Sequence, residues 1–176
     1  MRIFILFTLI MVSLILEGQQ RENHYAPKVS SIDSIITNLY DVISGEKGES
    51  RDWELMKYLF HPEAKLIPTG KNKEDLFTAR FLTVDDYIES SGKWLIENGF
   101  YEVEMHRSVD TFGPITQVFS SYESFRSKKE TVPFMRGINS IQLLNDSSRW
   151  WIINIFWSQE SSENPIPEKY LPNRKH

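Results

Sequence analysis

The sequence predicts an α+β domain in which three helices lie on one face of an antiparallel sheet. Two observations carry this prediction: apolar residues recur at helical spacing in three segments before residue 99, and the pattern changes to an alternation of period two after Phe100. Helices first and strands afterwards is the order of an α+β fold. The length of 176 residues, 40% of them hydrophobic, suits one domain with its own core.

Three segments carry the helical pattern, and each has a recognisable start and stop. The starts are residues whose side-chain oxygen can accept a backbone N–H, at Ser30 or Ser31, Asp52 and Thr83. The stops are SGEKGE after residue 43, His61-Pro62 and Asn98-Gly99. Between the second and third helices, AKLIP (64–68) predicts a short strand, TGKNKED (69–75) a polar loop, and 77–82 a short extended piece.

Four strands are expected over roughly 100–110, 115–126, 132–144 and 149–158, with the turn sequences FGP, SKKE and NDSS between them. In the last strand, alternation places Trp151, Ile153, Ile155 and Trp157 on one face and Trp150, Ile152, Asn154 and Phe156 on the other. A sheet with one solvated face would carry polar residues there, but both of these faces are apolar. We therefore expect helices over one face and a second subunit over the other, in a homodimer formed through the sheet.

The first residues have the pattern of a signal peptide. MRIFILFTLIMVSLILEG has a basic second residue and an apolar run from Ile3 to Leu16, followed by polar residues. The run is shorter than the ~20 apolar residues of a membrane span. We expect residues 1–18 to be removed on export to the periplasm or the exterior, which leaves no membrane attachment; an uncleaved anchor is the alternative. Residues 19–28 are expected to be a linker, 29–171 the folded domain and 172–176 a tail.

Charge and motif content exclude several classes of function. The net charge is −4 and the basic residues are dispersed, so a nucleic-acid partner is not expected. Four scattered histidines without a metal-ligand spacing, and no cysteine, predict no metal site and no disulfide. Glycine-rich phosphate loops, dinucleotide fingerprints and nucleophile elbows are missing from the sequence, and we expect no cofactor.

Several segments resemble the SnoaL-like members of the nuclear transport factor 2-like superfamily: ISGEKGESRDWELMKYLFHPEAKLI (43–67), EVEMHRSVDTFGPITQVFSSYES (102–124), RGINSIQL and RWWIINIFW. The similarity extends from about residue 30 to 171. It implies a cone-like domain with three N-terminal helices in the concavity of a strongly curved antiparallel sheet, a pocket between them, and dimers through the sheet. The superfamily includes isomerases, dehydratases, epoxide hydrolases, cyclases and binding modules, so the resemblance implies no single reaction.

One enzyme of that superfamily, ketosteroid isomerase, tests whether catalytic residues carry over. It uses a tyrosine on the first helix to polarise the substrate and an aspartate at the end of the first strand as general base. Tyr40 lies where such a tyrosine would be. The aspartate position falls near Pro68, in IPTG, where no carboxylate stands. The resemblance therefore does not extend to proton abstraction of that kind.

The strands themselves offer one candidate acid/base pair. Closing the hairpins about FGP and SKKE places Glu104 across from Tyr122, His106 across from Ser120 and Asn139 across from Asn154, all on one face. Glu104 could then orient His106 as a general base, with Tyr40 or Tyr122 donating a hydrogen bond. The alternative is that Glu104 and His106 line a polar dimer interface or an exposed rim. A single bulge would move one of them to the other face.

The opposite face would carry Arg107, Arg136, Trp151 and Trp157. If that face is the concave one, the pocket is aromatic with cations at its mouth, and it suits an anionic or carboxylate-bearing apolar ligand. The alternative is that Arg136 pairs with Glu123 or stacks on Trp157 as part of the structure.

Three functions are compatible with these patterns. The leading one is an exported domain that binds a small, mostly apolar molecule in a pocket between sheet and helices, with no reaction assigned. The second is a cofactor-free lyase, isomerase or hydrolase that uses Glu104 and His106 as its acid/base pair. The third is a non-catalytic dimeric interaction module whose pocket is filled by its own side chains, such as Trp151 and Trp157. The sequence leaves open whether the protein is an enzyme.

Overall fold

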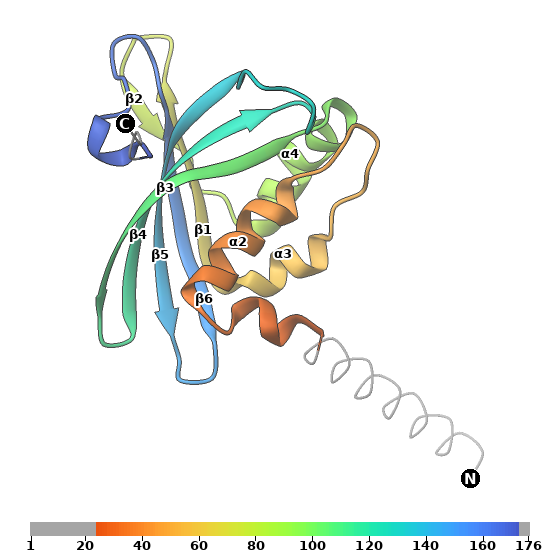
Figure 1. Cartoon of the computed structure of the whole chain (residues 1–176), viewed down its shortest axis with the longest axis vertical. Coiled ribbons are helices and arrows are strands. Elements are labelled where there is room, and N and C mark those ends of the chain that lie inside the picture. The colour runs from red at the N-terminus through yellow and green to blue at the C-terminus, as the bar shows by residue number, and fades with distance from the viewer. Residues whose placement is uncertain (1–23, 173–176) are drawn as a thin grey trace, which may run out of the picture.

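The structure, a computed structural model, describes residues 24–172. Its helical elements are η1 (Ala26–Val29), α2 (Ile32–Ile43), α3 (Trp53–Leu59), α4 (Val84–Asn98) and η2 (Glu168–Tyr170). Its strands are β1 (Phe60–Lys71), β2 (Phe77–Ala79), β3 (Tyr101–Phe112), β4 (Ile115–Phe125), β5 (Met135–Asn145) and β6 (Trp150–Gln159). Figure 1 shows the long strands curving around α2, α3 and α4. The predicted α+β class, with helices in the concavity of a curved sheet, is confirmed.

The three predicted helices are present and begin at predicted caps. The side chains of Ser31, Asp52 and Thr83 each accept a hydrogen bond from a backbone N–H of the first helical turn. The Asp86 carboxylate in turn accepts a hydrogen bond from the backbone N–H of Thr83, which completes a capping box on α4. The core lies between these helices and the sheet, where Ile35 on α2 and Leu59 on α3 are fully buried.

The chain joins this core before residue 29. Tyr25 and Val29 are buried, and the Tyr25 hydroxyl donates to the Asp52 carboxylate at 3.0 Å. The prediction of a linker is therefore wrong for residues 24–28. Tyr25 packs in the core, although its neighbours in the sequence are polar. The proposed signal peptide (1–18) lies outside the described residues, as does the tail from residue 173. Within 24–172, no helix is long and apolar enough to cross a membrane.

The sheet has six strands in the order β2-β1-β6-β5-β4-β3. The meander from β3 to β6 is antiparallel, as predicted, but β1 lies beside β6 and runs parallel to it. The sheet is therefore mixed rather than purely antiparallel. β1 is also longer than the expected strand over 64–68, because the predicted polar loop continues the strand into a hairpin with β2, in which Thr69 pairs with Ala79.

A bulge in β3 changes the predicted faces of that strand. Glu104 pairs with Tyr122 as expected, but His106 pairs with Ser121 rather than Ser120, so the ladder contains one extra residue, Met105. Because side chains alternate along a strand, one extra residue reverses every face beyond it. The prediction that Glu104 and His106 share a face is wrong for this reason. Arg107, not His106, follows Glu104 on the concave face.

A second bulge, in the tryptophan-rich strand β6, also changes the predicted faces of its side chains. Gln142 pairs with Asn154 and the next residue, Leu143, pairs with Ile152, which leaves Ile153 as the extra residue. Trp150, Ile152, Ile155 and Trp157 consequently pack on the core side. The predicted grouping of Trp151 with Trp157 is wrong. The predicted pairing of Asn139 with Asn154 is also wrong, since Asn139 pairs with Trp157.

The outer, convex face of the sheet is partly covered by the C-terminal segment. Ser121 donates a hydrogen bond to the backbone oxygen of Tyr170 at 2.5 Å, and the rings of Phe119 and Tyr170 lie 4.9 Å apart. The chain itself therefore covers part of the apolar face for which a second subunit was expected. The homodimer through the sheet stays a prediction.

Candidate functional site

A cavity of about 200 Å³ lies between α2, α4 and the concave face of the sheet. Its wall is mostly apolar and aromatic, and consists of Leu39, Tyr40, Ile43, Met56, Leu66, Tyr87, Ser91, Trp94, Leu95, Phe100, Glu102, Tyr122, Met135, Asn139, Ile155 and Trp157. Ligand pockets commonly have this composition, with few polar groups that converge. An apolar cavity of about 150 Å³ can hold benzene, so this one has room for a ring with a short substituent.

Three polar residues of the wall, Tyr40, Glu102 and Asn139, belong to one chain of hydrogen bonds. The Tyr40 hydroxyl lies 2.7 Å from Ser120 Oγ, and Asn139 Nδ2 donates to Tyr40 Oη at 3.2 Å. Asn139 Nδ2 also donates to Glu102 Oε1 at 3.1 Å. At the far end, Ser120 Oγ donates to Glu104 Oε1 at 2.5 Å. Four elements, α2, β3, β4 and β5, therefore meet at this network.

The network fixes where its protons lie. Ser120 has a single hydroxyl proton, which it gives to Glu104, so the Tyr40 hydroxyl must donate to Ser120 Oγ. Tyr40 in turn accepts from Asn139. The one proton of Tyr40 is thus directed away from the cavity, and its predicted role as a hydrogen-bond donor to a ligand would require this chain to rearrange.

Glu102 is the charged residue of the wall. Its carboxylate accepts from Asn139 and, at 3.3 Å, from Ser124 Oγ, both of which are neutral donors. Burial raises the pKa of Glu102 from 4.5 to about 7, and the two hydrogen bonds offset only part of that rise. Glu102 therefore changes its charge near neutral pH, inside the cavity.

The tyrosines around Glu102 stay neutral in that range. Burial raises the pKa of the hydroxyls of Tyr40, Tyr87 and Tyr122, and the nearby Glu102 carboxylate raises each further. Their rings thus present neutral aromatic surface to the cavity, and Glu102 is the group whose protonation can vary.

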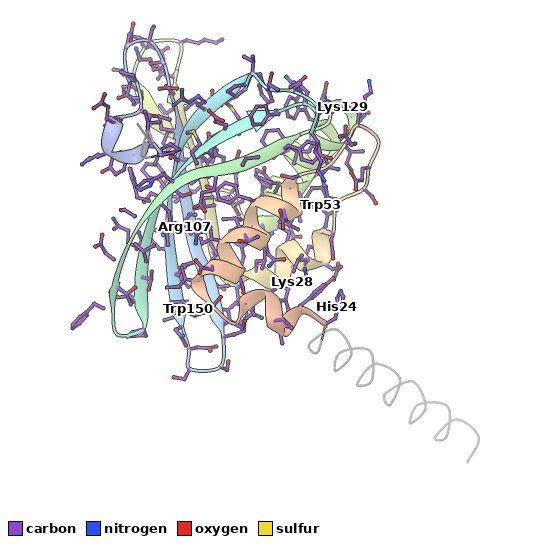
Figure 2. All side chains as sticks on the ribbon, viewed as in Figure 1. His24, Lys28, Trp53, Arg107, Lys129 and Trp150 are labelled. Carbon is purple, nitrogen blue, oxygen red and sulfur yellow. The ribbon has the colours of Figure 1, made fainter. Side chains whose placement is uncertain are left out.

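The structure brings together four of the residues singled out from sequence, since Tyr40, Tyr122, Asn139 and Trp157 all line the cavity. Glu104 lies on the same concave face but outside the wall. Its carboxylate binds Arg107 Nε at 2.9 Å as well as Ser120. Arg107, labelled in Figure 2, also donates to Asp33 on α2 at 3.0 Å, so it pairs with two acidic residues, neither of which belongs to the cavity wall.

The other predicted site residues lie on the outer face. His106 is placed there by the bulge at Met105. Arg136 pairs with Glu160 at 3.3 Å and Glu123 at 3.8 Å, which is the structural alternative stated for it. Trp151 contacts His61 edge to face and donates to Asp146, and Asn154 pairs with Gln142. The Glu104-His106 acid/base pair and the arginine-lined anion pocket are therefore not formed.

Sequence reasoning missed Glu102, Tyr87 and Trp94. A signal for Glu102 was available, because it stands two residues before Glu104 in EVEM and alternation puts both carboxylates on one face. The sequence does not show which of these two carboxylates lines the cavity. Tyr87 and Trp94 lie on α4, the third predicted helix, and they become part of the wall because this helix closes one side of the cavity.

Metal-ligand clusters do not occur in the described part of the chain. Between residues 24 and 172, no three His, Cys, Asp or Glu side chains gather in a way that could hold a metal ion.

A scan of protein-family models and a search of curated proteins found no match to the sequence. Solved structures do match. A nuclear transport factor 2-like protein from Cytophaga hutchinsonii is 13% identical, with a TM-score of 0.53, over 73% of this chain and 95% of that chain. A second such protein, of unknown function, from Silicibacter pomeroyi is 13% identical, with a TM-score of 0.50, over 73% and 92%.

A third match is the beta subunit of a candidate aromatic-ring-hydroxylating dioxygenase from Novosphingobium aromaticivorans. It is 12% identical, with a TM-score of 0.56, over 74% of this chain and 87% of that chain. Identities this low show the fold and not the reaction. Together with the three helices inside a curved, six-stranded mixed sheet, these matches show that the chain has the nuclear transport factor 2-like fold.

Proposed function

We propose that the protein binds a small, mostly apolar molecule in the cavity between α2, α4 and the sheet. The observation that carries this proposal is that the cavity is open to a ligand rather than filled by the chain. Trp151, which would help fill it in the interaction-module alternative, lies on the outer face, and Trp157 forms part of the wall. The space of about 200 Å³ and the aromatic lining favour a compact ligand with one ring.

A thermal-shift screen of small aromatic and alicyclic compounds tests this proposal. A ligand at ~100 times its dissociation constant stabilises the folded state by about 2.7 kcal/mol, which raises the melting temperature of a domain of this size by roughly 5–10 °C. We expect hits with one ring to raise the melting temperature. If no compound of a broad library does so, the proposal fails.

Two substitutions on α4 locate the site. Ser91 lines the cavity, whereas Ser90 is exposed beside it. Ser91→Phe should fill part of the space and abolish the ligand-induced shift, and Ser90→Phe, which adds the same group one residue away, should leave it intact. Equal shifts in both variants would place the ligand elsewhere.

A second candidate function is cofactor-free acid–base catalysis with Glu102 as the base. One observation favours it: burial holds the pKa of Glu102 at about 7, which suits a general base at neutral pH. This candidate replaces the predicted pair of Glu104 and His106. Its test is hydrogen–deuterium exchange, followed by NMR, at the carbon beside the carbonyl of a bound cyclic ketone. Exchange that occurs with the parent protein and is lost in Glu102→Gln supports catalysis. If the protein exchanges the ketone no faster than solvent does, the catalytic candidate fails and only the binding function is left.

A further inference from the structure

We propose that the cavity selects an organic cation, a small amine with an aromatic or alicyclic body whose ammonium group pairs with the Glu102 carboxylate. This inference rests on the proposed function, that the cavity binds a small molecule, and names the chemical class of that molecule. It is opposite in charge to the anionic ligand that an arginine-lined pocket would have suited.

The charges of the wall carry the first step. Glu102 is its one charged side chain, and the wall contains no lysine, arginine or histidine. The arginines expected to attract an anion are bound to acidic residues elsewhere, Arg107 to Glu104 and Arg136 to Glu160. An anionic ligand would therefore meet a carboxylate and no compensating cation.

The hydrogen bonds carry the second step. Asn139 uses one N–H for Glu102 and the other for Tyr40, and Ser124 supplies the remaining bond to Glu102. These donors are neutral, so the negative charge of Glu102 has no counter-ion among the described residues. A partly buried carboxylate without a counter-ion is unfavourable, and an ammonium group in the cavity would supply the missing charge.

The aromatic lining carries the third step. Tyr40, Tyr87, Tyr122, Trp94 and Trp157 surround the space next to Glu102. The face of an aromatic ring carries partial negative charge and attracts ammonium groups. A wall of rings with one carboxylate thus stabilises a cation from several sides, while the apolar remainder of the wall accommodates the body of the ligand.

The pH dependence follows from the groups that face Glu102. In the cavity these are Tyr40 on α2, Tyr87 on α4, Tyr122 on β4 and Asn139 on β5, and none of them changes charge between pH 5.5 and 8. On its other side Glu102 borders a hollow that also contains charged residues, none of which contributes to the pKa shift of Glu102: Asp41, Glu49, Lys128 and Glu130. Protonation of Glu102 below about pH 7 should weaken amine binding, because the proton removes the negative charge. With that pKa, the affinity should fall roughly thirtyfold between pH 8 and pH 5.5, while the amine, with a pKa of about 10, stays charged.

Three probes with the same ring and spacer separate charge from shape: 2-phenylethylamine, 2-phenylethanol and 3-phenylpropanoate, measured by calorimetry at pH 8 and pH 5.5. At pH 8 we expect the amine to bind at least ~10-fold more tightly than the alcohol, and the carboxylate to bind most weakly. Glu102→Gln should remove the preference for the amine and leave alcohol binding unchanged. Glu123→Gln, on the outer face, is the matched control and should change neither.

The outcomes separate this inference from the proposal on which it rests. If the amine and the alcohol bind equally well and Glu102→Gln changes neither, the cavity binds ligands without selecting a cation, and the inference fails alone. Tighter binding of the carboxylate also overturns it. If none of the probes binds and the library produces no thermal shift, both proposals fail.

Discussion

The unpaired carboxylate of Glu102 should make the stability of the protein depend on pH in a way that one substitution can reveal. The pKa of Glu102 is about 7 in the folded state, against an ordinary value of 4.5. Below pH 4.5 the group is protonated in both states and costs nothing. Between pH 4.5 and 7 only the unfolded state releases the proton, so the free energy of unfolding falls as the pH rises, and above about pH 7 the full penalty applies.

The size of this penalty follows from the two pKa values. They differ by about 2.5, and each pKa unit corresponds to ~1.36 kcal/mol, so the penalty is up to about 3 kcal/mol. Glu102→Gln keeps the shape and removes the ionisation. We therefore expect the variant to unfold with about the same free energy as the parent at pH 4.5, and to be more stable by up to about 3 kcal/mol at pH 8.

Urea unfolding of both proteins at several pH values between 4.5 and 8 measures this difference. Groups other than Glu102 contribute equally to both proteins and cancel in the comparison. The reasoning is refuted if the difference between variant and parent stays constant over that range, or if the variant is the less stable protein at pH 8. The same experiment with Glu123→Gln, whose carboxylate has Arg136 as a partner, should show no gain at pH 8.

Three further substitutions test the packing of the site by urea unfolding. Gly137→Ala should lower stability by about 1–3 kcal/mol, because its Cβ would lie 2.5 Å from the Tyr122 hydroxyl. An unchanged urea midpoint would show that β4 and β5 can move apart at this pair of residues. Tyr40→Phe should cost about 1–3 kcal/mol, since the buried Ser120 hydroxyl loses its donor, and a gain in stability would contradict the assigned network. Asp52→Ala should cost at least about 1 kcal/mol, because α3 loses its N-cap and the Tyr25 hydroxyl loses an acceptor, and no loss would mean that both contacts are dispensable.

Much of the fold follows from local signals in the sequence. Ser31, Asp52 and Thr83 predict the starts of three helices correctly, because a cap depends on residues within one turn of it. The four strands after Phe100 also follow, since their turns and alternation are local. The parallel contact of β1 with β6 does not follow, because it joins segments about 90 residues apart and no local pattern specifies the pairing.

The faces of β3 and β6 could not be predicted, and the reason is the same in both strands. Each contains one extra residue, Met105 in β3 and Ile153 in β6, and both are ordinary strand residues with no glycine or proline to mark a bulge. Within each strand, residues on the same side of the bulge keep the predicted alternation relative to one another, although Trp157 lies on the face of Asn139 and not on the opposite face as predicted. Beyond it every side chain is reversed, which moved His106 and Trp151 out of the site.

The bulge at Met105 also decides which of two neighbouring acids is available to a ligand. Glu102 and Glu104 both point to the concave face, and nothing in their own sequence distinguishes them. The extra residue turns Arg107 onto that face, where it neutralises Glu104 with a contact of 2.5 Å. Glu102, on the other side of Glu104, lies beyond reach of that cation and keeps only neutral hydrogen-bond donors. One inserted residue thus removes the predicted acid/base pair and leaves an uncompensated carboxylate in the cavity, which is the feature on which the cation proposal depends.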